Sequence, residues 1–463
     1  MSIQRTGRLI LAGLAIVALP TLADTPANPT STPAERTFTH TLSNGLKIIV
    51  REDHRAPVMV SQVWYKVGSS YETPGLTGIS HVLEHMMFKG TPMVPAGEFS
   101  KIIANYGGSE NAFTTYDYTA YYQLMNARDL PLSFELEADR MQHALIPDAE
   151  FKKEIEVVKE ERRMRTDDNP NALAFERFSA AAYISSGYHH PTIGWMHDIN
   201  RITAADVRNW YHNWYAPNNA ILVVVGDVKA PDVFQLAARY FGSIPRHDLP
   251  KPQVDQEVKP LGERRLTLDL PARLPTLYMG YNVPGINTAQ DENDVYALRM
   301  LAAVLDGGAS ARIETRLVRG QQIAASAGAS YGGFSLGDTL FILSGIPSEG
   351  HTLTELETAL KDQIAQLQTD LATPDELERI KAQIISGIVF QQDSISSQAN
   401  QIGRLEAIGR SWRDGDQLAA KLEQVTPEQI RAVARKYLVS DRLTVAYLQP
   451  KPQPKNGNAT DGQ

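Results

Sequence analysis

The sequence predicts an α+β protein built from two related domains. The chain has 463 residues, more than a single ordinary core accommodates, so about two to four domains are expected. Short β-rich runs alternate with amphipathic helical segments in both halves. The end of the first half, at residues 202–208, returns at residues 425–431. This similarity indicates duplication of a whole domain of roughly two hundred residues.

The first half opens with a predicted hairpin. Residues 37–42 and 46–51 have strand character, and Asn44-Gly45 between them favours a tight turn. A charged helix is expected to stop before Pro170, and Thr203 is a candidate N-cap. The later elements expected in this half are strands at 58–67, 111–124 and 220–225, and helices at 81–88, 98–106, 148–165 and 204–215.

A linker is predicted between the two halves. Residues 246–262 hold three prolines and many charges, which favours an irregular connection. We therefore expect an N-terminal domain at 36–245 and a C-terminal domain at 263–449. The second domain repeats the plan, with strands expected at 265–270 and 276–281 and helices at 294–305 and 375–390.

The two ends of the chain are predicted to lie outside the folded domains. Arg5 and Arg8 precede an apolar run and a small-x-small cleavage site, so residues 1–23 are predicted to be a signal peptide. The apolar run is short for a membrane span, and an uncleaved anchor is the alternative. After cleavage we expect no stable membrane span. Residues 24–35 are expected to be a loose lead-in and residues 450–463 a disordered tail.

Composition excludes several classes of function. The chain has no cysteine, which excludes disulfides, thiolate zinc sites and cysteine nucleophiles. Its net charge is −8 and no basic patch stands out, so nucleic acid is not an expected partner. Together with the signal peptide, the absence of cysteine predicts a location in a bacterial periplasm or outside the cell.

The most informative stretch is the motif that contains His81, Glu84 and His85. Two histidines four residues apart lie on the same face of a helix, so both imidazoles can reach one metal ion. Glu84 lies beside the second histidine, where a carboxylate can act as general base on a water molecule at the metal. The order of the residues is the inverted H-x-x-E-H pattern. Three unrelated helix residues are the alternative interpretation.

A catalytic zinc site needs a third protein ligand, and a carboxylate is a common choice. Glu154 and Glu161 are seven residues apart on a predicted helix and therefore share a face. Glu160 competes with Glu161 for the ligand role. On pattern alone, Glu154 and Glu161 are more often solvated helix charges than ligands.

The duplicated half lacks the metal motif. When Gly90 is aligned with Gly307, the three motif residues fall opposite Leu298, Leu301 and Ala302. The N-terminal half is therefore predicted to contain the metal site, and the C-terminal half to have apolar core at the matching positions.

With these features, the chain resembles the pitrilysin/insulinase family of zinc peptidases, which includes the mitochondrial processing peptidases. The resemblance covers residues 37–449. By resemblance, His81, His85 and Glu161 are the ligands of one Zn²⁺ per chain, Glu84 is the catalytic base, and Glu154 supports a ligand histidine. The motifs that carry the resemblance are the H-x-x-E-H stretch, Phe88-Lys89-Gly90-Thr91, Asn111-Ala112-Phe113-Thr114, residues 117–122 and residues 215–219.

The resemblance also implies a fold and a partner. Each domain is expected to be an antiparallel-rich sheet with helices packed on it, and the two domains together to form half of a clamshell. Two such chains enclose a chamber, as a homodimer or as a heterodimer with a related chain that lacks the metal motif. The arginine and tyrosine that assist catalysis in the family are replaced here. The arginine position aligns with Val318, with Arg319 one place off, and the tyrosine position aligns with Ala325. A partner chain is therefore expected to bring these groups.

The predicted reaction is hydrolysis of short or unfolded peptides. The segment Asn111, Ala112 and Phe113 resembles the family's edge strand, which pairs with the substrate backbone. Three other interpretations remain open. The chain could be a non-catalytic zinc-bearing subunit, a peptide-binding module that uses the edge strand alone, or a metal hydrolase of another kind.

Overall fold

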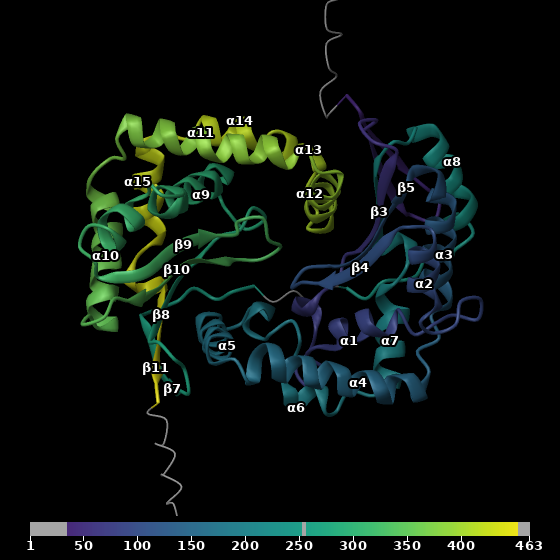
Figure 1. Ribbon diagram of the computed structural model, residues 1–463, viewed down its shortest axis with the longest axis horizontal. Coiled ribbons are helices and arrows are strands. Elements are labelled where there is room, and N and C mark those ends of the chain that lie inside the picture. The colour runs from purple at the N-terminus through teal and green to yellow at the C-terminus, as the bar shows by residue number, and fades with distance from the viewer. Residues whose placement is uncertain (1–34, 252–255, 452–463) are drawn as a thin grey trace, which may run out of the picture.

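The computed structural model describes residues 35–251 and 256–451 (Figure 1). The predicted signal peptide, nearly all of the lead-in and nearly all of the tail lie outside these residues. Within the described ranges, no helix combines the length and the apolar character that crossing a bilayer requires.

The N-terminal domain contains a six-stranded mixed sheet. Its order is β1 (Thr37–Thr41), β2 (Lys47–Glu52), β6 (Ala220–Gly226), β3 (Val58–Tyr65), β5 (Thr119–Asn126) and β4 (Ser109–Thr114). Only β2 and β6 run parallel. The predicted hairpin at Asn44-Gly45 is confirmed, because β1 and β2 pair antiparallel across it. Gly45 there has φ of 94°, a conformation that glycine adopts without strain.

The single strand predicted at 111–124 is wrong, because the structure has a hairpin there. The hydroxyl of Thr115 accepts hydrogen bonds from the backbone N–H groups of Asp117 and Tyr118, at 3.2 Å each. This side-chain turn reverses the chain between β4 and β5, which a pattern of β-formers alone does not reveal. As a result, β4 lies at the edge of the sheet.

The C-terminal domain repeats this topology with five strands. Their order is β7 (Arg264–Leu270), β11 (Leu443–Pro450), β8 (Thr276–Val283), β10 (Thr339–Pro347) and β9 (Ala324–Tyr331). The parallel pair β7 and β11 matches β2 and β6, and the remaining neighbours are antiparallel. The predicted duplication and the α+β fold of two similar domains are therefore confirmed.

Helices cover one face of each sheet. In the N-terminal domain these include α1 (Ile79–Met86), α2 (Glu98–Asn105), α3 (Leu130–His143), α7 (Ala204–Trp214) and α8 (Ala230–Phe241). The matching helices of the other domain include α9 (Glu292–Asp306), α10 (Leu353–Thr369) and α15 (Pro427–Tyr437). Helices α7 and α15 begin at the duplicated threonines, Thr203 and Thr426, and each threonine forms a capping box.

On the opposite face of each sheet packs a helix from the other half of the chain. Helix α5 (Pro170–Ala182) of the first half packs on the C-terminal sheet, and α12 (Ile395–Ala407) of the second half packs on the N-terminal sheet (Figure 1). At Gly403 of α12, a Cβ atom would lie 2.0 Å from the Trp64 ring. Trp64 is 1% exposed, so glycine is required for this close approach.

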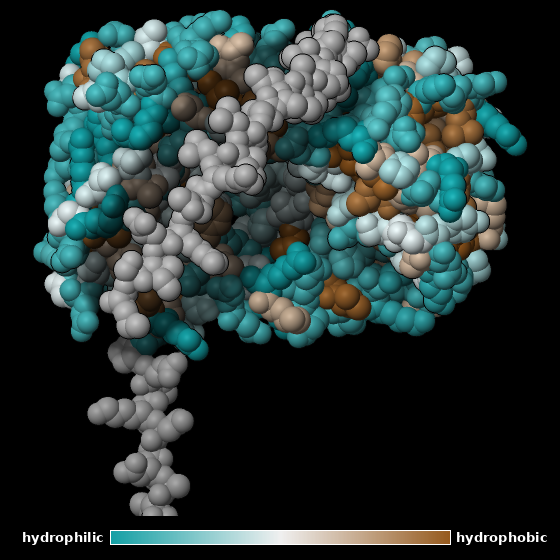
Figure 2. Space-filling view, turned by 45° about the horizontal axis from the view of Figure 1, so that its top comes forward, coloured by the Kyte–Doolittle hydropathy of each residue, from teal (hydrophilic) through white to brown (hydrophobic). Residues whose placement is uncertain are grey.

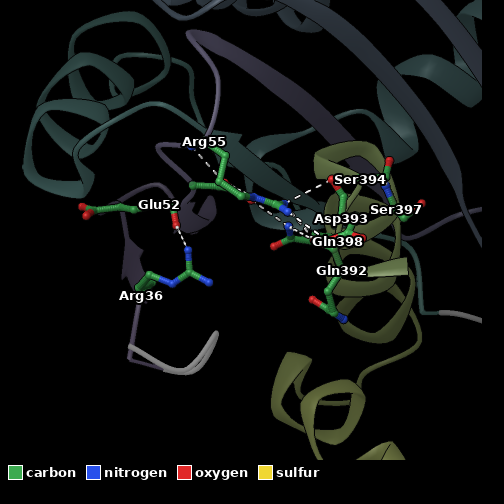
Figure 3. A network of polar contacts seen from close by, with 9 residues as sticks. Arg36, Glu52, Arg55, Gln392, Asp393, Ser394, Ser397 and Gln398 are labelled. Carbon is green, nitrogen blue, oxygen red and sulfur yellow. Dashed lines mark hydrogen bonds and ion pairs between the residues drawn. The ribbon is translucent and has the colours of Figure 1, made fainter. Parts of the chain in front are cut away.

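A polar network joins the N-terminal domain to the chain between α11 (Pro374–Gln391) and α12 (Figure 3). Arg55 donates hydrogen bonds to the Gln392 carbonyl at 2.9 Å and to the Asp393 carboxylate at 3.1 Å. The same guanidinium binds Asp53 at 2.6 Å, and Gln398 donates to that carboxylate at 3.0 Å. These bonds fix α12 on the N-terminal sheet.

The face of the molecule shown in Figure 2 is largely hydrophilic. Figure 2 shows hydrophobic residues gathered in patches on the right-hand lobe, which is the N-terminal domain, and a hollow between the two lobes. The two lobes are the two domains of the half-clamshell predicted from the sequence (Figure 1).

Candidate metal centre

Helix α1 presents the motif residues, and its start is fixed by a buried carboxylate. Glu72 accepts hydrogen bonds from the backbone N–H groups of Gly78 at 2.6 Å and Ser80 at 2.8 Å. Gly78 has φ of 92°, and a Cβ atom there would lie 2.5 Å from the Ile193 carbonyl oxygen. The helix therefore begins just before His81 and places the whole motif within two turns.

The two histidines lie side by side as predicted. Their ring centroids are 4.7 Å apart and the rings are inclined at 75°. Both face helix α4 (Asp148–Arg162), which packs against α1 through its buried residues Ile155 and Val158. This packing directs Glu154 and Glu161, which lie beside the buried residues of α4, toward the two histidines.

Glu161 completes a three-residue cluster. Its Oε2 atom lies 3.7 Å from His81 Nε2 and 3.2 Å from His85 Nε2. One ligand atom from each of the three side chains falls within 4.8 Å of the others. Glu160, the competing candidate, points away, since its side chain is 59% exposed and pairs with Arg163 at 2.9 Å. The tertiary structure thus places Glu161, and not Glu160, at the two histidines.

The cluster fits a zinc ion. Two imidazole nitrogens and one carboxylate oxygen form a common protein donor set for catalytic zinc. Ligand atoms around a tetrahedral zinc are roughly 3.3 Å apart. The separations of 3.2 and 3.7 Å between Glu161 Oε2 and the two histidine Nε2 atoms lie on either side of this value, so the donor set fits the ion.

Glu154 holds the second histidine. Its carboxylate lies 2.9 Å from His85 Nδ1, so His85 presents Nε2 to the cluster. Lys89 pairs with the other oxygen of Glu154 at 2.5 Å, and Arg165 pairs with Glu161 at 2.6 Å. The roles of Lys89 and Arg165 were missed from the sequence. The spacing of Glu161 and Arg165, four residues apart on a helix, was the available signal for the second pair.

The electrostatics of the cluster favour positive charge. Burial alone would lower the pKa of His85, but hydrogen bonds to Glu154 and Glu161 outweigh it and raise this pKa to about 9. Burial, followed by the charge of His85, lowers the pKa of His81 to about 4. The two carboxylates therefore stabilise one cationic charge between the histidines, which a divalent metal ion supplies in full.

Glu84 lies beside the cluster and is separately positioned. Its Oε2 atom accepts a 2.5 Å hydrogen bond from the hydroxyl of Thr114 on β4. Burial raises the pKa of Glu84, and the Thr114 hydrogen bond moderates this rise. A carboxylate with a raised pKa is suited to accept and return a proton near neutral pH.

Strand β4 borders the site on one side. A cavity of about 600 Å³ is lined by His81, Glu84, His85 and the strand residues Asn111, Ala112 and Phe113. A second cavity of about 580 Å³ shares Glu84, His85 and Asn111. Space thus extends from the cluster toward both ends of β4, which lies at the edge of the sheet that the described residues form.

Comparisons with known proteins agree with this geometry. Residues 47–194 match the family model for insulinase (peptidase family M16), and residues 201–384 match the model for the peptidase M16 inactive domain. The chain is 32% identical over 450 residues to the zinc protease PqqE of Helicobacter pylori, covering 95% of this chain and 98% of that one. The chain belongs to peptidase family M16.

Solved structures show the same M16 fold. The crystal structure of a protease from Helicobacter pylori matches with a TM-score of 0.84 and 30% identity, over 89% of this chain and 99% of that chain. The periplasmic protease PqqL of Escherichia coli matches with a TM-score of 0.75 and 18% identity. In that case the match covers 90% of this chain and 48% of the other, so this chain corresponds to half of PqqL in fold.

The C-terminal domain carries no equivalent cluster at the aligned positions. Leu298, Leu301 and Ala302 are buried in α9, as expected for apolar core in place of a metal site. Arg319 is 57% exposed and pairs with Glu314 at 3.2 Å, while Ala325 lies on β9. This arrangement agrees with the family model for this domain, whose description is inactive.

Proposed function

We propose that the chain is a zinc-dependent endopeptidase that hydrolyses short or unfolded peptides. The observation that carries this proposal is the placement of Glu84 beside the His81, His85 and Glu161 cluster, where Thr114 holds its carboxylate. A site that binds metal only for structure has no need of a positioned base. The similarity to a relative named zinc protease supports the same conclusion.

His81, His85 and Glu161 would hold one zinc ion per chain. Bound zinc supplies the Lewis acidity that activates water and polarises a peptide carbonyl. Glu84 takes a proton from the attacking water and later delivers it to the leaving amine. Thr114 keeps the Glu84 carboxylate pointed at the reacting atoms, and Glu154 keeps His85 oriented through its Nδ1 atom.

Strand β4 is the proposed substrate platform. Its outer edge is free in the described sheet, so a peptide can add to it by backbone hydrogen bonds at Asn111, Ala112 and Phe113. Backbone pairing requires an extended chain, which selects short or unfolded substrates. Asn111 is exposed and Ala112 has a small side chain, so both positions leave room for a peptide to approach the strand.

A second chain is part of the proposal. This chain matches half of PqqL, and Val318 and Ala325 replace the assisting arginine and tyrosine expected by resemblance. We infer that the chain pairs with a copy of itself, or with a related chain lacking the metal motif, to close a chamber. The sequence of residues 1–23 supports export to the periplasm or the exterior.

The test is hydrolysis of a mixed pool of unfolded peptides by the purified chain, with and without a zinc chelator. Cleavage that the chelator abolishes and added zinc restores is the expected result. The Glu84→Gln variant should retain zinc and lose activity by about three orders of magnitude or more. If cleavage persists in that variant, Glu84 is not the base. If zinc-loaded protein cleaves nothing alone or with a related partner chain, the peptidase proposal fails.

A further inference from the structure

A cavity of about 360 Å³ lies on the opposite side of β4 from α1. It is bordered by Phe113 and Tyr118 of the β4–β5 hairpin and by helices α9, α11 and α12 of the C-terminal domain. Successive residues of a strand point to opposite faces. Thr114 contacts Glu84 on the α1 face, so its neighbour Phe113 faces α12 and the cavity. In Figure 1, α12 lies across the sheet from the side that α1 occupies.

The cavity carries positive charge without a counter-ion. Arg299 and Arg404 both line it, and none of the described residues in its lining has a carboxylate. Burial, and then the charge of Arg404, lowers the pKa of Arg299. The Nε atom of Arg404 is buried and has no hydrogen-bond partner within the described chain. Two half-buried guanidinium groups that face one cavity raise the free energy of the folded protein unless an anion pairs with them.

Neutral donors in the same lining complement the arginines. Asn400 accepts a hydrogen bond from Gln62 at 2.8 Å through its amide oxygen, and Gln401 accepts one from Gln392 at 3.1 Å. Their oxygens are thereby occupied, which leaves the two amide NH₂ groups as donors. Guanidinium forks and amide N–H groups together match the oxygens of a carboxylate.

We propose that this cavity is a carboxylate-binding subsite for a peptide held on β4. The proposal rests on the proposed peptidase function and names a substrate class for it, namely peptides with a carboxylate at one fixed distance from the scissile bond. A peptide paired with β4 alternates its side chains between the two faces, as the strand does. The residue beside Phe113 therefore points toward Arg299 and Arg404 while its neighbours face the metal cluster.

Two sources of the carboxylate share this chemistry, an acidic side chain and a free C-terminus. Binding of fluorescent ten-residue peptides to the zinc-loaded Glu84→Gln chain distinguishes them. One set has an amidated end and a single Glu or Gln moved through the sequence. The other set has no acidic side chain and ends in either a free acid or an amide. We expect at least tenfold tighter binding for Glu at one position, or for the free acid at one peptide length.

Arg299→Gln and Arg404→Gln should each remove this preference while binding of the neutral peptides stays unchanged. Arg379→Gln is the charge-matched control, because Arg379 is exposed on α11 and does not line the cavity, and it should keep the preference. Peptide binding that ignores acidic groups in every set, or a preference that survives both cavity variants, overturns the subsite alone. Failure of the wild-type chain both to bind and to cleave any peptide instead overturns the proposed function.

Discussion

The hydroxyl of Thr114 donates a 2.5 Å hydrogen bond to Oε2 of Glu84. This bond joins the edge strand to the helix that carries the metal motif. Thr114 directly follows the strand residues that would pair with the substrate backbone, and it orients Glu84, the proposed base. The bond therefore links substrate binding to catalysis in the proposed peptidase.

Thr114→Val should reduce kcat for peptide cleavage about tenfold, because a hydrogen bond to a charged group of this kind contributes about 1.5–3 kcal/mol. KM and zinc content should change little, since the hydroxyl lies neither in the cluster nor in the pairing backbone. Steady-state kinetics with one quenched fluorescent peptide measures both parameters. Thr114→Ser keeps the hydroxyl and should restore kcat; equal rates for the Val and Ser variants would exclude a positioning role.

His81→Ala, His85→Ala and Glu161→Ala should each abolish stoichiometric zinc binding, because each removes one of the three donors in the cluster. Glu154→Gln should weaken zinc binding about 10- to 100-fold through the loss of support for His85. Zinc content by elemental analysis and competition with a chromophoric chelator provide the measurements. The control is Glu160→Gln, which should bind zinc as the wild type does; a loss there would reassign the third ligand.

Replacement of Gly403 by alanine should destabilise the protein by about 1–3 kcal/mol, because the added Cβ cannot fit against Trp64 without moving α12. Urea unfolding measures the change. Gly387→Ala in α11 is the matched control. Nothing lies within 4 Å of its added Cβ, so it should stabilise the helix by up to about 1 kcal/mol. Similar effects of the two substitutions would show that α12 does not depend on the close approach.

Glu357 should make the C-terminal domain sensitive to acid. Burial opposes its ionisation, but hydrogen bonds from Arg265, Lys361 and Tyr447 outweigh burial and lower its pKa from 4.5 to about 2. Its contribution is therefore fully present above pH 4.5 and is lost as the pH falls toward 2.

The Glu357→Gln variant should be less stable than the wild type at pH 7, and the difference should shrink between pH 4.5 and 2. Unfolding free energies from urea titrations across this range provide the measurement. Glu378→Gln is the control, since Glu378 is exposed on α11 and its substitution should have little effect at any pH. A difference for Glu357→Gln that is independent of pH would contradict the lowered pKa.

Much of the fold was predictable from local sequence. The Asn44-Gly45 turn, the N-cap at Thr203 and the helices for which bounds were predicted depend on neighbouring residues, and the structure has them within a few positions of those bounds. The prediction of one strand at 111–124 failed because a side-chain turn at Thr115, rather than glycine or proline, reverses the chain.

The sequence by itself determined the metal motif, because His81, Glu84 and His85 lie within two turns of one helix and their relative placement follows from helix geometry. It also determined the duplication. Only the tertiary structure decided that Glu161 rather than Glu160 meets the histidines, that Thr114 holds Glu84, and that Arg299 and Arg404 share a cavity. Those relationships join segments that are distant in the chain, and long-range packing of helices on sheets sets them, which no local pattern encodes.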